Sequence, residues 1–473
     1  MKTSPIAAAA LAALAPRQES CDVSILTPDY EIPAVRAGWQ AQLVMNGLVK
    51  PRTIEVDSEG ALLILDAGAG VRHVTFNDHG STCLEVDQNR LIVDNDKLNH
   101  GMALSLDGKT LYASDVENVY AWAYNPATGS IDGEPTVVVT NMTSNQHVTR
   151  TLLVSEHSPG YLVISRGSNE NLAALSQHMD SGMSQIRAFN VNSTDSYPIQ
   201  FLDGVVLGWG LRNSVGVAED PVTGNIYSVE NSVDDVERDG QLIKEDNPGE
   251  ELNLHGTIEN ASDSSPRNYG YPMCFAVWDA DDIPNHDGLQ VGDQFASDIN
   301  STLTDDICNT EYHKPRLAFP AHYAPLDARF NKDGDELFVS FHGSFNREDP
   351  HGYKLSTVEF NNGEPVEPRN STNSLTDIVY MRSTDACPDN CFRPVGLAWD
   401  SKDRLFVTSD STGEVFILER QSGTPTSDEA GTFVQPAQSG STDGDSGSAA
   451  SGVVVQTMGV VAAALCAAML LSF

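Results

Sequence analysis

One pattern recurs along this chain: an apolar alternation, a turn containing Asp or Gly, and a second alternation that ends in small polar residues. Alternation with a period of two is typical of β-strands, and long helical periodicity is almost absent. A unit of four short strands cannot bury both of its faces alone, so such units stack radially. We therefore predict an all-β fold, a six-bladed β-propeller, from six copies of the pattern at 53–76, 101–124, 151–167, 215–232, 328–344 and 395–419.

The two ends of the chain depart from this repeat. Residues 1–17 combine a basic Lys2, a short apolar run and an A-x-A sequence, which predicts a cleaved signal peptide. Residues 449–473 are uncharged and follow small and polar residues, which predicts a GPI-anchor signal that is removed; a single transmembrane helix is the alternative. Residues 18–420 then form the propeller, and 421–448 a flexible stalk rich in Ser, Gly and Thr. We expect a secreted monomer at the cell surface, attached to the membrane through that anchor alone.

Cysteines and sequons agree with secretion. Of the seven cysteines, Cys466 lies in the C-terminal segment, and the other six form an even set for which disulfides are the default. Cys387 and Cys391 enclose a short loop and are the first pair expected; Cys274 with Cys308 and Cys21 with Cys83 follow, among the several connectivities that six cysteines allow. N-glycosylation is predicted at the sequons that begin with Asn141, Asn192, Asn260, Asn300 and Asn370.

The distribution of charge points to one face of the propeller. A formal net charge of -38 argues against a nucleic-acid partner, because phosphate binding needs clustered Lys and Arg. Residues just before each inner strand should ring the mouth of the central channel, and basic or imidazole groups recur there. A single one of these is more often a surface ion pair or a hydrogen-bonded interior histidine. Together they predict a pocket for an anion with several carboxylates, built from Arg52, His100, His147, Arg212 and Arg393, with Arg166 and His342 after inner strands.

Several segments resemble one known family. GLRNSVGVA, YSVENSVDDVERDG, DNPGEELNL, NYGYP, SFHGSFNREDPHGYK and FRPVGLAWDSKDRLFVTSDSTGEVF are similar to segments of the soluble dehydrogenases of glucose and sorbosone that depend on pyrroloquinoline quinone (PQQ). Among these, the secreted fungal pyranose dehydrogenases are most similar. The resemblance covers about residues 38 to 418. It implies that PQQ lies over the propeller axis together with Ca²⁺.

The resemblance also implies roles for individual residues. His147 stands where the family's general base precedes a strand, and Arg212 with Asn213 matches the Arg-Asn pair that contacts the quinone. Main-chain carbonyls at the positions of Asn231 and Ser232 help to hold Ca²⁺. The candidates for the carboxylates and ring of PQQ are Arg52, Arg166, His342 and Arg393, with His100 where bacterial relatives carry a Gln beside the sugar.

These residue types suit the oxidation of a sugar C1 hydroxyl. A neutral imidazole can take the O–H proton as hydride leaves for the quinone, while a guanidinium and Ca²⁺ stabilise the charge that the quinone oxygen gains. We therefore expect an extracellular PQQ- and Ca²⁺-dependent dehydrogenase that acts on pyranoses and passes electrons to a separate acceptor.

Alternatives remain open from the sequence. They are a calcium-dependent lactonase-like hydrolase, which would need acidic and amide side chains converging on a metal, and a non-catalytic cell-surface binding propeller. Asp234 and Asp235 fit a solvated turn as well as metal ligation. The acidic run 246–251 fits a second calcium loop or a charged turn.

Overall fold

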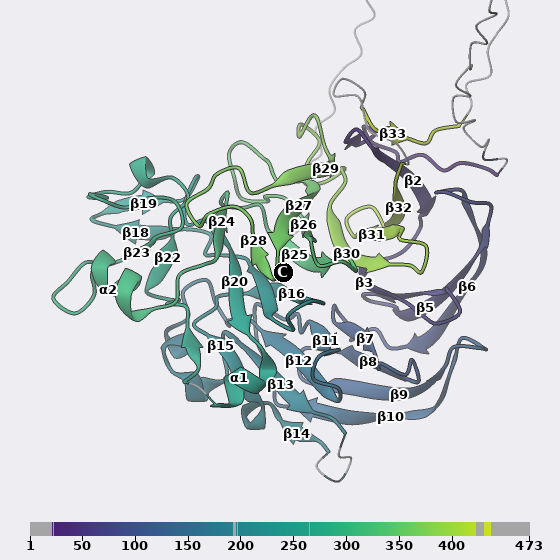
Figure 1. Ribbon diagram of the computed structural model, residues 1–473, viewed down its shortest axis with the longest axis horizontal. Coiled ribbons are helices and arrows are strands. Elements are labelled where there is room, and N and C mark those ends of the chain that lie inside the picture. The colour runs from purple at the N-terminus through teal and green to yellow at the C-terminus, as the bar shows by residue number, and fades with distance from the viewer. Residues whose placement is uncertain are drawn as a thin grey trace, which may run out of the picture.

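Six small sheets, mainly antiparallel, are arranged around a central axis as six blades, which confirms the predicted all-β propeller (Figure 1). The computed structural model describes residues 21, 23–192, 195, 197–263, 265–421 and 430–436. The predicted signal peptide and anchor signal, and most of the predicted stalk, lie outside these residues. No helix within the described ranges is long and apolar enough to cross a bilayer.

The strands follow one another outward from the channel within each blade. The first three blades are β3 (Pro51–Val56), β4 (Leu62–Asp66), β5 (Gly70–Asp78) and β6 (Leu84–Asp94); β7 (Met102–Leu104), β8 (Thr110–Ser114), β9 (Val119–Asn125), β10 (Ser130–Thr140) and β14 (Ile199–Gln200); and β11 (Leu152–Val154), β12 (Tyr161–Arg166), β13 (Gln185–Asn190), β15 (Val205–Trp209) and β21 (Arg267–Asn268).

The fourth, fifth and sixth blades repeat this order. They are β16 (Ser214–Glu219), β17 (Ile226–Glu230), β20 (Glu250–Gly256) and β24 (Leu317–Phe319); β25 (Pro325–Phe330), β26 (Glu336–Phe341), β27 (Lys354–Asn361), β29 (Thr376–Tyr380) and β1 (Ala34–Val35), with β28 (Glu364–Pro365) paired to β27; and β30 (Pro394–Trp399), β31 (Leu405–Ser409), β32 (Glu414–Arg420), β2 (Trp39–Met45) and β33 (Thr432–Phe433).

An N-terminal strand closes the ring. Strand β2 pairs antiparallel with β32, so purple and yellow strands lie side by side in blade 6 (Figure 1). The apolar core lies between neighbouring blades: Phe338 of blade 5 packs in one cluster with Leu397 and Phe416 of blade 6. Each blade therefore depends on its neighbour to bury its faces.

Three glycines let the inner strands approach one another at the channel. A Cβ on Gly101 would lie 1.8 Å from the Arg150 carbonyl oxygen of the next blade, and a Cβ on Gly396 would lie 2.2 Å from that of Arg52. Gly216 meets the backbone of Asp327 in the same way. These contacts set the spacing of the residues that precede the inner strands.

The interval 233–327 contains both blade strands and an insert. Strands β20 and β24 complete blade 4. The remainder forms the hairpin β18 (Val236–Arg238) with β19 (Gln241–Ile243), the hairpin β22 (Cys274–Ala276) with β23 (Gln294–Ala296), and the helices α1 (Ile258–Asp263) and α2 (Asp305–Glu311). Short 3₁₀ turns occur at η1 (Ala174–Gln177), η2 (Met179–Ser181), η4 (Phe201–Asp203) and η5 (Ala280–Asp282).

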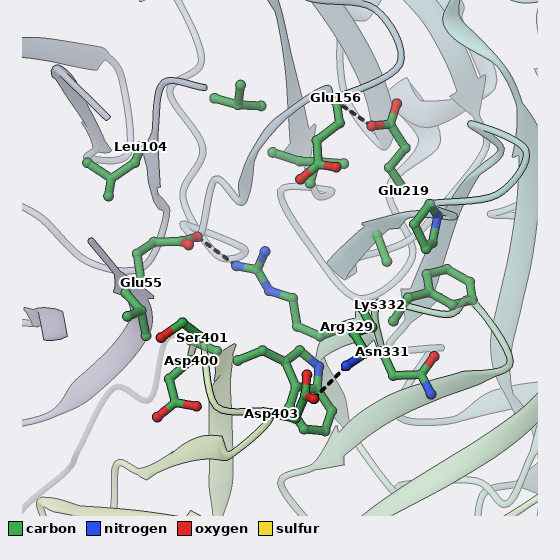
Figure 2. Close-up of a pocket in the computed structure, with 18 of the residues that line it drawn as sticks. Glu55, Leu104, Glu156, Glu219, Arg329, Asn331, Lys332, Asp400, Ser401 and Asp403 are labelled. Atoms are coloured by element: carbon green, nitrogen blue, oxygen red, sulfur yellow. Dashed lines mark hydrogen bonds and ion pairs between the residues drawn. The ribbon is translucent and has the colours of Figure 1, made fainter. Parts of the chain in front are cut away.

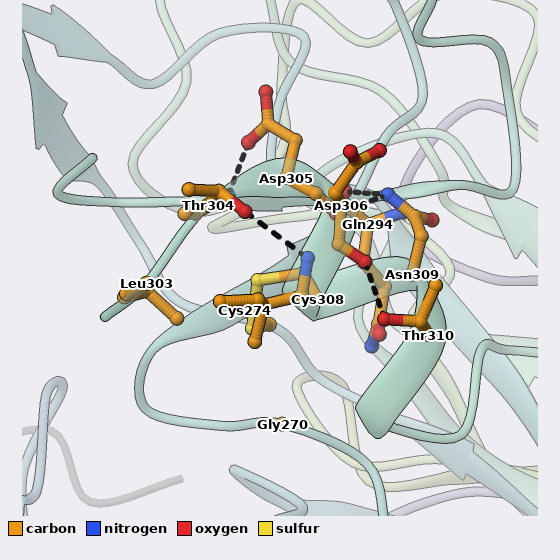
Figure 3. Close-up of a disulfide and its surroundings, with 12 residues drawn as sticks. Gly270, Cys274, Gln294, Leu303, Thr304, Asp305, Asp306, Cys308, Asn309 and Thr310 are labelled. Carbon is orange, nitrogen blue, oxygen red and sulfur yellow. Dashed lines mark hydrogen bonds between the residues drawn. A yellow bond between two sulfur atoms is a disulfide. The ribbon is translucent and has the colours of Figure 1, made fainter. Parts of the chain in front are cut away.

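The insert has its own internal links. The guanidinium of Arg238 is buried and donates to both carboxylate oxygens of Asp305 at 2.9 Å. The disulfide Cys274–Cys308 joins β22 to α2 beside the capped start of that helix (Figure 3). All three predicted pairings are present, the others being Cys21–Cys83 and Cys387–Cys391. The five sequon asparagines are exposed, so their glycosylation stays a prediction that the fold permits.

The disulfide Cys274–Cys308 of the insert should stabilise the protein more than the disulfide Cys387–Cys391, which closes a shorter loop. Cys274 and Cys308 are 34 residues apart and Cys387 and Cys391 only 4. The loop-closure entropy that each disulfide removes from the unfolded chain then stabilises the folded protein by about 4 and about 2 kcal/mol, respectively. Equilibrium urea unfolding should show a larger loss in the variant C274S/C308S than in the matched variant C387S/C391S. Equal losses would show that chain entropy does not dominate here.

Candidate active site

Five of the predicted residues meet in one cavity at the channel mouth. His147, Arg212, Asn213, Asn231 and Ser232 lie in the segments before β11, before β16 and after β17. The cavity has a volume of about 170 Å³. Its other lining residues are Gln146, Asp234, Glu250, His322, Ala324, Ser344, Phe345 and Asn346.

The surroundings of His147 select one tautomer. Its Nδ1 lies 2.9 Å from the Ser168 carbonyl oxygen and 2.9 Å from the Ser168 hydroxyl oxygen. That hydroxyl donates its own proton to the Glu170 carbonyl oxygen, so both groups at Nδ1 are acceptors. Nδ1 therefore carries the proton, and Nε2 keeps its lone pair.

The His147 imidazole is also neutral. The side chain is buried, and this burial together with the Arg212 guanidinium lowers its pKa to about 3. An imidazole with a fixed tautomer and an unprotonated Nε2 can accept a proton from a ligand in the cavity.

The guanidinium of Arg212 is surrounded by oxygens. Nη1 donates to the carbonyl oxygens of Asn231 at 3.3 Å and Ser232 at 2.6 Å. Nη2 donates to Asn171 Oδ1 at 2.9 Å and to Asp234 Oδ2 at 3.2 Å. The carbonyl oxygens of Asn231 and Ser232, which we predict to bind a metal, thus point towards the Arg212 guanidinium. Carbonyl oxygens are among the ligands that Ca²⁺ prefers.

Buried glutamates, which the sequence interpretation missed, lie beside this oxygen group. Glu250 accepts the backbone N–H groups of Ser232 at 2.7 Å and Ala324 at 3.0 Å, and burial raises its pKa to about 8. Glu230 and Glu251 both accept hydrogen bonds from the Asn253 amide, and burial raises both pKa values. The run 246–251 is therefore not an open charged turn, since Glu250 and Glu251 begin the buried strand β20.

Four further predicted residues form a second, buried cluster. Asp410, at the end of blade 6's second strand, pairs with Arg52 and with His342 Nε2 at 2.6 Å. Arg393 donates to His342 Nδ1 at 2.8 Å, and Arg52 donates to His100 Nδ1 at 3.2 Å. None of these residues lines the 170 Å³ cavity.

This Asp410 cluster carries an excess of positive charge. Burial opposes ionisation of Asp410, but the hydrogen bond from His342 Nε2–H and the guanidinium of Arg52 outweigh it and hold its pKa well below the ordinary value. Burial, followed by the neighbouring guanidinium, lowers the pKa of His342 to about 4 and that of His100 well below 6.5, so both imidazoles are neutral. The Asp410 carboxylate, paired with Arg52, then balances only one of the two guanidiniums in a chain that is otherwise strongly acidic, which favours a bound anion.

Arg166 lies apart from both groups. It donates to the carbonyl oxygens of Thr143 at 2.8 Å and Gly182 at 3.3 Å, and its guanidinium carbon lies 5.4 Å from the centre of the Phe201 ring. These contacts anchor loops beside blade 3. A role for Arg166 in binding a cofactor stays a prediction.

The opposite end of the channel has different chemistry. A cavity of about 1080 Å³ is lined by the carboxyl ends of the inner strands and the turns after them (Figure 2). Arg329 donates to Glu55 at 2.8 Å across it, and Lys332 pairs with Asp403 near its rim. It contains none of the predicted site residues, so these gather at one end. Across the described residues, no group of three or more His, Cys, Asp and Glu side chains is placed to hold a metal.

Comparisons with known proteins agree with the geometry. The family model described as TrAA12-like matches residues 33–421. A PQQ-dependent sugar dehydrogenase of Hypocrea jecorina is 47% identical over 411 residues, which cover 85% of this chain and 93% of that protein. A PQQ-dependent pyranose dehydrogenase of Coprinopsis cinerea is 36% identical over 417 residues, covering 84% of this chain and 56% of the longer relative.

Solved structures show the same likeness. A Trichoderma reesei enzyme of carbohydrate-active enzyme family AA12, solved with iodide, superposes with a TM-score of 0.82 at 47% identity and covers 84% of this chain and 100% of that one. The holo PQQ domain of the Coprinopsis cinerea pyranose dehydrogenase superposes with a TM-score of 0.78 at 34% identity, covering 84% and 98%.

The raised pKa of Glu250 predicts how stability depends on pH. The folded protein holds a proton that the unfolded chain, with a glutamate pKa of 4.5, has released. The contribution of this proton to the free energy of unfolding is fully present below about pH 4.5 and is lost as the pH rises through about 8. The buried imidazoles do not offset it above pH 6.5, because their pKa values are lowered.

Urea unfolding in EDTA at pH 6.5 and pH 8.0 tests this. The variant E250Q should lose less stability than the unmodified protein across this interval, by about 1–2 kcal/mol. The variant E359Q, at an exposed glutamate of β27, should behave like the unmodified protein. An unaltered pH dependence in E250Q would contradict the assignment.

Proposed function

The chain belongs to the TrAA12-like family, and from this premise we propose that it is an extracellular PQQ- and Ca²⁺-dependent dehydrogenase that oxidises the C1 hydroxyl of pyranose sugars. The observation that carries the proposal is His147: a neutral, cavity-lining imidazole with the proton held on Nδ1 and the lone pair on Nε2. A base held in this form beside a guanidinium is what the removal of a proton from a bound hydroxyl group requires.

The residues present suit the two bound groups. The carbonyl oxygens of Asn231 and Ser232, with the Asp234 carboxylate, would hold Ca²⁺. Arg212 would face the quinone, and the excess guanidinium charge of Arg52 and Arg393 suits an acid with several carboxylates. PQQ supplies the two-electron oxidant when it is bound.

The chain's own residues then handle the proton. His147 Nε2 takes it from the C1 hydroxyl, while the Ser168 acceptors stabilise the protonated ring through Nδ1–H. Arg212 contributes to the low pKa of His147, so a bound anion that neutralises Arg212 would raise this pKa towards the working range. The proposal also includes a separate electron acceptor and attachment at the cell surface through a GPI anchor.

A cofactor titration is the direct test. The purified protein is stripped with EDTA, titrated with PQQ in the presence and absence of Ca²⁺, and assayed for sugar-dependent reduction of an artificial acceptor. We expect saturable PQQ binding that needs Ca²⁺, followed by turnover. A well-folded protein that binds no PQQ would overturn the proposal.

Replacing His147 should separate catalysis from binding. The variant H147A should retain PQQ binding but lose turnover by about 10²–10⁴-fold, the usual contribution of a general base. The variant H79A, at a half-exposed histidine outside the cavity, should keep normal turnover. Full activity in H147A would exclude His147 as the base.

Replacing Arg212 should act on the cofactor. In the variant R212A we expect PQQ affinity to fall about 10- to 100-fold, as for the loss of a charge-assisted hydrogen bond. Fluorescence titration with PQQ measures this, and thermal unfolding checks that the variant is folded. Unchanged affinity in a folded R212A protein would place the cofactor elsewhere.

A further inference from the structure

One aromatic side chain, that of Phe345, is more exposed to solvent than the other aromatic side chains that the structure describes. Across the described residues, every Phe, Tyr and Trp is buried or half-buried except Phe345, which is 44% exposed. Burying an aromatic ring is among the larger apolar gains available to a fold. Phe345 instead lines the cavity that contains His147 and Arg212.

The loop that carries Phe345 is held firmly on both sides. Ser344 and His351 exchange two hydrogen bonds of 3.0 Å, one to the Ser344 hydroxyl and one to the His351 carbonyl oxygen. Arg347 donates to Asp246 at 2.9 Å, to the Glu245 carbonyl oxygen and to the Asp349 carbonyl oxygen at 3.0 Å. The ring is therefore presented at the cavity by a fixed loop.

Two neutral amide side chains line the same cavity as Phe345. Asn346 follows Phe345 along the loop, and Gln146 precedes the base His147; both line the cavity and both are half-buried. An amide side chain offers donors and an acceptor together, which suits hydroxyl groups. Neither residue was among the predicted site residues.

An exposed aromatic ring and neutral amides in one cavity suit a cyclic sugar, whose faces and edge differ in chemistry. A pyranose has C–H groups on the faces of its ring and hydroxyl groups around its edge. The C–H groups pack on an aromatic ring, and the hydroxyl groups pair with amides.

We infer that Phe345, with the amides of Gln146 and Asn346, forms the subsite that holds the pyranose ring of the substrate, with its C1 hydroxyl towards His147. This inference rests on the proposed function and names residues that determine affinity for the sugar. Phe345 is a binding residue, and the proton transfer does not require it.

Three substitutions at Phe345 test the subsite. F345A removes the ring, F345L keeps an apolar side chain without a flat face, and F345W keeps an aromatic face. Each is assayed with D-glucose, D-galactose, D-mannose and L-fucose at a saturating artificial acceptor, with PQQ affinity measured by titration. L242A is the matched control, since Leu242 is 66% exposed on β19 and does not line the cavity.

The expected result is a change in KM alone. F345A and F345L should raise KM about 2- to 12-fold for the sugars that are oxidised, while F345W, like L242A, should keep KM close to that of the unmodified protein. The kcat and the affinity for PQQ should not change.

The contrary outcomes are distinct. Normal KM in F345A, with turnover in the unmodified protein, would overturn the subsite and leave the proposed function standing. Weaker PQQ binding in F345A would assign the ring to the cofactor and overturn the subsite. Absence of turnover with all four sugars, despite PQQ binding, would overturn the proposed function and this inference with it.

Discussion

The close approach of neighbouring inner strands is the constraint on which the site depends. Neighbouring inner strands can approach closely because Gly101, Gly216 and Gly396 present no side chain to the backbone of the next blade. Residues that precede the inner strands therefore lie close together at one mouth although they are far apart in the sequence. The mutual burial of adjacent blades then keeps this arrangement rigid.

Charge is organised at this mouth in two parts with different chemistry. Around Arg212, oxygens outnumber the single cation; around Asp410, one carboxylate balances only one of two guanidiniums. A metal ion suits the first group and an anion suits the second. The base His147 belongs to the first group, where burial keeps it neutral and the acceptors of Ser168 set its tautomer.

The sequence predicted the fold well because each blade repeats the same local alternation, and a period of two has few other solutions. It also predicted that His147 and Arg212 meet, since the phase of the repeat places them at one mouth, and the resemblance to the dehydrogenase family added Asn231 to the same site. It could not predict Asp410, whose segment reads like other polar strand ends, or Glu250, which reads like part of a charged turn. Arg166 is the last residue of β12, and its side chain turns to the carbonyl oxygens of Thr143 and Gly182, which the repeat pattern does not specify.

The pairing of β2 with β32 also has a consequence for biosynthesis. It joins residues whose numbers differ by 370 to 381, from Met45 with Val415 to Trp39 with Arg420. While the chain emerges from the ribosome, blade 1 must wait with one face uncovered until almost the whole propeller has been made. The last step of folding is therefore a long-range closure, and it is the stage at which chaperones would be needed most.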